Sequence, residues 1–188
     1  HNPHENFRFL AVVATVTEAV FRHADIIRMG IASHGNDHRL GANEAPPSIM
    51  SVFLGDTLTK IFESMVSSGD YVHAARQTLD LGTRQLADIF KDNTDRNRTS
   101  PFAFTGNKFK FRACGSSASI GYPLSILNAC IVDIFEETNK IIENELAKGK
   151  TSDEALAAVI LKLYSNAQAV VFNGDGYSAE WVKEAAKR

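Results

Sequence analysis

Cysteine is scarce in this sequence, and its scarcity limits the chemistry that the chain can use. The 188 residues include two cysteines, Cys114 and Cys130, whose spacing is not that of a metal site. Two thiols this far apart do not make a disulfide framework, and such a pattern is typical of a reducing compartment. We therefore interpret both as buried, inert thiols.

Strong net charge and long hydrophobic runs are missing as well. The 20 basic and 22 acidic side chains give a formal net charge of −2 at pH 7, so no overall field attracts nucleic acid or anionic lipid. No segment is apolar for long enough to span a bilayer, and residues 1–6 have no signal-peptide character. We expect a cytoplasmic protein without nucleic-acid or membrane partners, in which any anion site is local.

Apolar residues, by contrast, are plentiful. They make up 44% of the sequence, which is enough for one sizeable core. No repeat, linker or low-complexity tract divides the chain, so we predict one unit over residues 1–188, of the α+β class and α-rich. The chain begins without methionine and enters a helical pattern almost at once, which indicates a fragment of a longer polypeptide.

The secondary structure follows from the spacing of apolar residues and from capping signals. Helices are expected over 5–23, 56–67 and 83–90, then over 123–148 with Pro123 at the first position. Two more are expected, one from the capping-box pair Thr151 and Glu154 onward and one from Ser178 to the end. Strands are expected over 26–32 and 49–54, with a further short strand at 78–81 as an open alternative, and a long functional loop over 34–47. His34, Asp37 and His38 suggest zinc, but Gly35 argues against a helical face carrying both imidazoles.

Residues 95–112 hold the strongest functional signal. From position 107 onward polar and apolar residues alternate, and alternate side chains of a strand point to opposite faces. The polar positions are cationic: Lys108, Lys110 and Arg112. The turn residues 105–107 let 102–105 pair with 109–112 as a hairpin, in which Phe109 and Phe111 face the core.

A cationic strand face of this kind has three interpretations. Like charges so close together favour an anionic partner, and Arg98 adds a planar group suited to phosphate or carboxylate. A solvated basic edge strand gives the same pattern, as does a platform for stacking single-stranded nucleic acid. The pattern alone leaves all three open.

Two long motifs add a resemblance. Residues 35–47, Gly-Asn-Asp-His-Arg-Leu-Gly-Ala-Asn-Glu-Ala-Pro-Pro, and residues 95–109, Asp-Arg-Asn-Arg-Thr-Ser-Pro-Phe-Ala-Phe-Thr-Gly-Asn-Lys-Phe, resemble the type III glutamine synthetases. Residues 172–181 are similar to the same family, and the resemblance extends over essentially the whole chain. It implies the C-terminal part of a catalytic domain, with antiparallel strands flanked by long helices and with the β-grasp domain and metal-binding glutamates upstream.

The activity that the resemblance implies is the ATP-dependent ligation of ammonia to glutamate through γ-glutamyl phosphate. ATP and Mg²⁺ or Mn²⁺ are the implied cofactors, and glutamate, ammonia and ATP are the implied partners. The implied assembly is a homo-oligomer, a dodecamer of two hexameric rings. The isolated chain is expected to be inactive, because most of the metal ligands would lie upstream.

The resemblance also assigns roles to individual residues. Glu44 matches the flap glutamate that closes over the site and helps to bind and deprotonate ammonium. Arg39 and Arg112 match arginines that hold the amino-acid substrate's carboxylate. Arg98 matches the arginine that stabilises the transferred phosphoryl group, and Lys108 occupies a phosphate-binding position.

Lys110 departs from the family pattern. The usual strand reads Asn-Lys-Phe-Glu-Phe-Arg, and its glutamate is a metal ligand, whereas this chain has lysine there. An ammonium group has no lone pair for a divalent cation and adds positive charge beside it. We therefore expect no metal ligand among the residues assigned here, and a non-catalytic synthetase-like binding or assembly protein is the alternative function.

Overall fold

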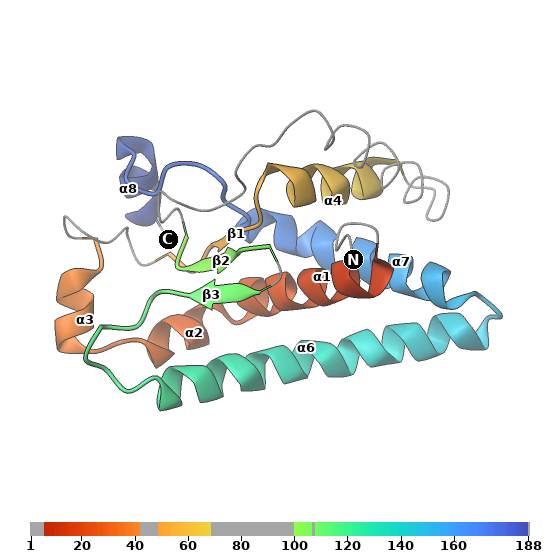
Figure 1. Ribbon diagram of the computed structural model, residues 1–188, viewed down its shortest axis with the longest axis horizontal. Coiled ribbons are helices and arrows are strands. Elements are labelled where there is room, and N and C mark those ends of the chain that lie inside the picture. The colour runs from red at the N-terminus through yellow and green to blue at the C-terminus, as the bar shows by residue number, and fades with distance from the viewer. Residues whose placement is uncertain (1–5, 42–48, 69–99, 107, 188) are drawn as a thin grey trace.

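The computed structural model describes residues 6–41, 49–68, 100–106 and 108–187. This part of the chain is α-rich and carries a small mixed sheet (Figure 1). In chain order its elements are α1 (Phe7–Arg22), α2 (Ala24–Gly30), α3 (His34–Arg39), β1 (Val52–Phe53), α4 (Asp56–Ser68), β2 (Phe102–Phe104), β3 (Phe109–Phe111), α6 (Gly121–Ala147), α7 (Ser152–Ala167), the 3₁₀ turn η2 (Gln168–Val170) and α8 (Ala179–Ala185).

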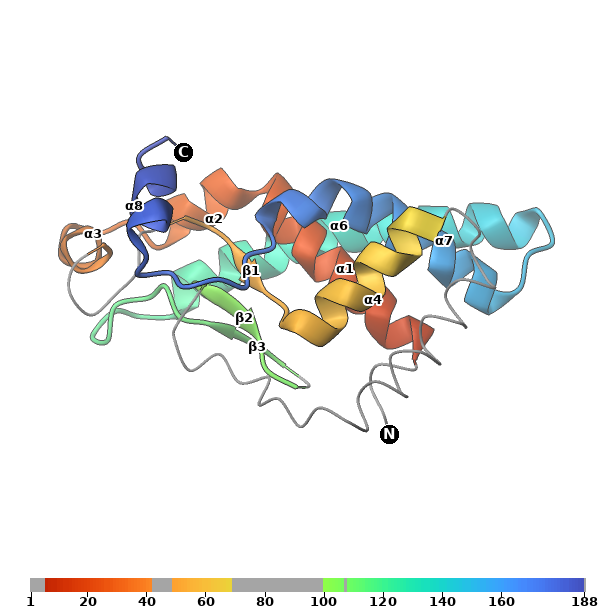
Figure 2. The ribbon, with the colours of Figure 1, turned by 90° about the horizontal axis from the view of Figure 1, so that it is seen from above.

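Three helices, α1, α6 and α7, form the centre of the core. Each packs against the other two, and α2 and α4 cover them by contacts to α6 and α7 respectively. Figure 2 shows the same arrangement from above, with α3 and α8 toward one end and the α6–α7 connection at the other. The rings of Phe62 on α4 and Tyr164 on α7 stack with centroids 4.5 Å apart, so this layer is held by large buried side chains.

The predicted helix ends are largely confirmed, because their capping groups lie within the local sequence. Oδ1 of Asn6 accepts hydrogen bonds from the main-chain nitrogens of Arg8 and Phe9 at the start of α1. Thr151 and Glu154 form the capping box of α7. α6 begins at Gly121, two residues before Pro123, which was expected as its first residue. Proline is tolerated in the first turn of a helix, because the N–H groups of that turn have no intrahelical acceptor.

The predicted hairpin is confirmed by the register of the sheet. β2 and β3 are antiparallel, with Phe102 opposite Phe111, Ala103 opposite Lys110, and Phe104 opposite Phe109. β1 pairs with β2 in parallel, so the whole sheet is mixed. The expected antiparallel pairing is therefore found in the hairpin but not throughout the sheet. The ring of Phe104 lies 5.6 Å from that of Phe9, measured between centroids, which packs the aromatic face of the hairpin against α1.

Two predicted elements are wrong. The strand expected over 26–32 is the helix α2, in which Ile27 is buried while Met29 is 55% exposed. A short apolar run fits a strand or a helix equally well, and here packing against α6 decides for the helix. The loop expected over 34–47 begins as the helix α3, where Oγ of the N-cap Ser33 accepts a hydrogen bond from the nitrogen of Asn36.

Not every apolar residue at helical spacing on these helices is buried. Phe21 of α1 is 40% exposed, and Leu124 and Leu146 of α6 are each 46% exposed. The reason on α6 is its length: 27 residues span about 40 Å, more than the 16-residue helices α1 and α7 beside it can cover. The segments expected at 78–81 and 83–90 lie outside the described residues.

The two cysteines are free, and burial raises the pKa of both thiols. Cys130 is buried, whereas Cys114 is half-buried. Among the helices of the described residues, none combines the length and the apolar character needed to cross a membrane.

Candidate anion-binding site

The hairpin sorts its side chains by face. Phe109 lies against the rings of Phe102 and Phe104, at 5.0 and 5.4 Å between centroids, on the side that packs toward the core. Lys108 and Lys110 alternate with the phenylalanines and are exposed. The turn closes by a 2.8 Å hydrogen bond from the nitrogen of Thr105 to the oxygen of Lys108, with Gly106 at φ +80°. The alternation predicted for Lys108 and Lys110 is therefore confirmed.

These two lysines are available to an anion. Within the described part of the chain, no ion pair joins either ammonium group to a carboxylate. They stand two residues apart on a short strand whose other face is fixed by aromatic packing. Phosphate or carboxylate oxygens can approach both from solvent.

Arg112 follows β3 and differs from the lysines in being half-buried. Its Nη2 donates a 2.7 Å hydrogen bond to the oxygen of Ser100, and its main-chain nitrogen donates one of 2.7 Å to the oxygen of Pro101. The hydroxyl of Ser100 accepts a hydrogen bond from Ser51 and donates one to the oxygen of Phe172. Arg112 is thus tied to the segment that enters β2, which is itself tied to Ser51, directly before β1, and to Phe172.

Arg39, the last residue of α3, reaches the same part of the chain. Its Nη2 donates to the main-chain oxygens of Ala113, at 3.1 Å, and Cys114, at 3.3 Å. Its Nε donates to Oδ1 of Asn36 at 3.1 Å. The structure therefore brings Arg39 onto the residues that directly follow Arg112, although 73 positions separate the two in sequence.

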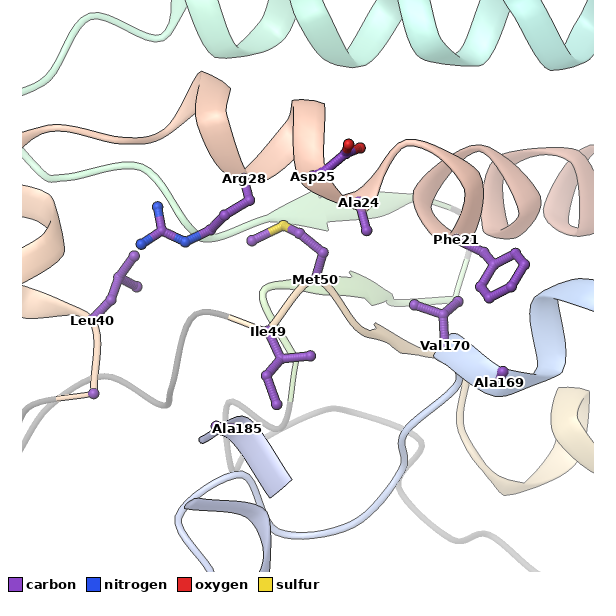
Figure 3. A pocket seen from close by; sticks show the side chains of 11 residues that line it. Phe21, Ala24, Asp25, Arg28, Leu40, Ile49, Met50, Ala169, Val170 and Ala185 are labelled. Atoms are coloured by element: carbon purple, nitrogen blue, oxygen red, sulfur yellow. The ribbon is translucent and has the colours of Figure 1, made fainter. Parts of the chain in front are cut away.

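Two other residues assigned by the resemblance, Glu44 and Arg98, lie outside the described residues. A cavity of about 710 Å³ is lined by Gly41 and Ile49, which are the described residues nearest to Glu44 in the sequence (Figure 3). The remaining lining residues are Phe21, Ala24, Asp25, Arg28, Leu40, Met50, Ala169, Val170 and Ala185.

The cavity is mostly apolar but carries two charged side chains. Figure 3 shows Met50 between Arg28 and Val170, with Leu40 beyond Arg28. Nη2 of Arg28 is paired with Oδ1 of Asp37 on α3 at 2.8 Å. Sequence reasoning missed this cavity because short segments far apart in the chain build it, and no local pattern marks such a site.

A divalent metal does not fit the described residues. No three side chains of histidine, cysteine, aspartate or glutamate gather anywhere in the described ranges. Lys110 is exposed at the position where a carboxylate ligand was expected, so the described hairpin places an ammonium there. His34 and His38 do share one helix, contrary to the argument from Gly35, but the described residues offer them no third ligand.

Comparison with known proteins finds similarity to glutamine synthetases. Residues 155–188 match the family model of the glutamine synthetase C-terminal domain. All of the chain aligns with the type-3 glutamine synthetase of Dictyostelium discoideum at 42% identity, covering 25% of that protein. It aligns equally completely with glutamine synthetases of Bacteroides fragilis (strain YCH46), at 40% identity, and Butyrivibrio fibrisolvens, at 42%, covering 26% of each.

The chain is thus similar along its whole length to part of proteins named glutamine synthetase, and residues 155–188 are similar to the C-terminal domain of that family. The similarity to the Dictyostelium protein, which is named a type-3 enzyme, agrees with the resemblance of the motifs to the type III enzymes. The chain spans about a quarter of the length of these relatives.

Proposed function

We propose that this chain is part of a glutamine synthetase that ligates ammonia to glutamate at the expense of ATP, through γ-glutamyl phosphate. The observation that carries the proposal is the similarity of the whole chain to proteins named glutamine synthetase. The exposed cationic face of the hairpin supports it, because a reaction of phosphates and carboxylates needs such groups. In this proposal residues 1–188 act as one unit of a larger catalytic domain.

Lys108, together with Arg98, is proposed to bind the phosphates. ATP, when bound, supplies the phosphoryl group that activates the γ-carboxylate of glutamate. Negative charge is spread over the phosphoryl oxygens during the transfer, and fixed cations lower the free energy of that state. The aromatic packing behind β3 and the closed turn fix the backbone that carries Lys108, so its charge is largely pre-positioned.

Arg39 and Arg112 are proposed to hold the carboxylate of the amino-acid substrate. Each guanidinium already donates to main-chain carbonyls, Arg39 to Ala113 and Cys114, and Arg112 to Ser100. The planar guanidinium fork matches the geometry of a carboxylate, which makes arginine suited to this role. A guanidinium held in this way loses little side-chain freedom when the substrate binds.

Glu44 is proposed to bind ammonium and to help deprotonate it. An anionic side chain attracts the cation and can accept its proton, which produces the ammonia that attacks the acyl phosphate. Closure of the segment over the site would also keep water from hydrolysing that intermediate. This role rests on the motif of residues 35–47.

One observation favours a second function, that of a non-catalytic, synthetase-like binding or assembly protein. Lys110 is exposed where the family pattern has a metal-binding carboxylate. A protein that had lost this ligand could still bind nucleotide and amino acid, or assemble with other subunits. Assembly into two hexameric rings, and a cytoplasmic location, remain predictions in either case.

The test uses steady-state kinetics of the intact protein with Mg²⁺ or Mn²⁺ and with glutamate, ammonia and ATP. Lys108→Ala should lower kcat/KM for ATP by about tenfold or more, which corresponds to the loss of one charge-assisted contact. Lys140→Ala, at an exposed position on α6, is the control and should leave kcat/KM unchanged. If the wild type binds ATP but forms no glutamine with either metal, the second function replaces the first.

A further inference from the structure

Asn36 is a buried polar residue on the short helix α3, and its side chain is 5% exposed. Its Nδ2 donates two hydrogen bonds of 2.8 Å, to the main-chain oxygens of Ile31 and Ala113. Its Oδ1 accepts the bond of 3.1 Å from Nε of Arg39. One side chain therefore joins the residue after α2, the residue that follows Arg112, and the guanidinium of Arg39.

Only an amide suits this position. Two carbonyl oxygens require a donor with two hydrogens, and the Nε–H of Arg39 requires an acceptor. The reversed amide would place oxygen against the two carbonyls and N–H against N–H, so the network permits one orientation. Aspartate lacks the donors, and an apolar residue lacks both functions and would leave buried carbonyls unpaired.

We infer that Asn36 is a positioning residue for substrate binding, which holds the guanidinium of Arg39 in place against the chain next to Arg112. The inference rests on the proposed function, since it takes Arg39 as a ligand of the substrate carboxylate. Asn36 and Arg39 share the oxygen of Ala113 as acceptor, so the guanidinium is held along its Nε and Nη2 edge. Its other edge remains for a carboxylate.

A separate contact on the same helix provides a matched control. Asp37 pairs with Arg28 at 2.8 Å and tethers α3 to α2, but its side chain is 45% exposed and the pair does not contact Arg39. An exposed pair of this kind contributes little to stability. Asp37→Asn therefore weakens the anchoring of α3 without altering the network around Asn36.

The experiment is a double-mutant cycle on the intact protein, with Asn36→Ala, Arg39→Ala, both together, and Asp37→Asn. The KM values for glutamate and ATP, kcat and the melting temperature are measured for each variant. Asn36→Ala should raise KM for glutamate by about tenfold while KM for ATP changes less than about twofold. In the Arg39→Ala background the same change should add less than about twofold, because the group that Asn36 holds is gone.

The possible results separate the two claims. Suppose that Arg39→Ala raises KM for glutamate. If Asn36→Ala then acts additively with Arg39→Ala, or if Asn36→Ala raises the KM values for glutamate and ATP alike, Asn36 is merely structural and the inference is wrong. If Arg39→Ala leaves KM for glutamate unchanged, the proposed role of Arg39 fails and the inference fails with it. Should Asn36→Ala not fold, Asn36→Ser keeps a hydroxyl that can donate to one of the buried carbonyls but is too short to hold Arg39, and its rise in KM for glutamate should likewise vanish when Arg39 is absent.

Discussion

Nη1 of Arg22 donates a 2.7 Å hydrogen bond to Oε2 of Glu137, which joins α1 to α6. Nη2 of Arg22 donates to the buried Glu18 at 2.7 Å, and Nζ of Lys162 on α7 lies 3.0 Å from Oε1 of Glu137. Four charged side chains thus connect the three central helices. The hydrogen bonds from Arg22 and then from Lys162 lower the pKa of Glu137.

Glu137→Gln should destabilise the folded protein by about 1 kcal/mol at neutral pH, because the carboxamide keeps one acceptor but loses the charge that both cations face. The folded pKa of Glu137 lies below its unfolded value, so its contribution is present above the unfolded pKa. That contribution is lost as the pH falls through the folded pKa. Urea unfolding of wild type and variant at neutral pH and near pH 3 measures the difference, which should shrink in acid. Glu136→Gln, on the exposed side of α6, should show no such pH-dependent difference.

Asn173→Ala should destabilise the protein by about 2 to 3 kcal/mol. Oδ1 of Asn173 accepts from the nitrogens of Leu54 and Gly55, at 3.1 and 3.0 Å, and Nδ2 donates to Oγ1 of Thr59 at 2.8 Å. Alanine leaves two N–H groups beside β1 without that acceptor. Asn173→Asp retains the acceptor and should cost less than half as much in a thermal or urea unfolding curve. A loss for Asn139→Ala, an exposed α6 position, as large as that for Asn173→Ala would contradict this account.

Lys110→Glu should raise the affinity of the intact protein for Mg²⁺ or Mn²⁺. Each interaction between unit charges at about 4 Å and an effective dielectric near 20 is worth roughly 4 kcal/mol before desolvation reduces it. If roughly 1.4 kcal/mol of this interaction energy remains, the affinity for the metal ion changes about tenfold. Calorimetric titration at matched ionic strength compares the variant with wild type and with Lys140→Glu, which makes the same charge change on α6. Equal affinities in all three would show that Lys110 does not face the metal site.

Glu44→Gln in the intact protein should uncouple ATP hydrolysis from glutamine formation. Under the proposed function, the amide keeps the size of the side chain but loses the charge proposed to attract ammonium, so more of the acyl phosphate should react with water. Parallel assays of phosphate and glutamine should show a phosphate-to-glutamine ratio above that of wild type. An equal loss of both products would instead indicate that Glu44 acts before phosphoryl transfer.

The sequence by itself determined the elements whose partners are local. The capping box of Thr151 and Glu154, the cap at Ser178 and the turn at Gly106 depend on groups a few residues apart, and all three were predicted. The alternation after position 107 likewise placed Lys108 and Lys110 on the exposed face, because a strand has a period of two whatever it packs against. The resemblance to the type III glutamine synthetases also came from the sequence alone, because its two motifs lie within short continuous segments.

Tertiary structure alone decided the rest. Residues 24–30 are a helix and not a strand because α6 packs against them, and a short apolar run is compatible with both. The parallel pairing of β1 with β2 joins segments 50 residues apart, as the pair Val52 and Phe102 shows. The hydrogen bond from Asn36 to Ala113 spans 77 residues. Contacts at such distances depend on how the helices pack, so no pattern within a local window specifies which carbonyl a buried amide or guanidinium will meet.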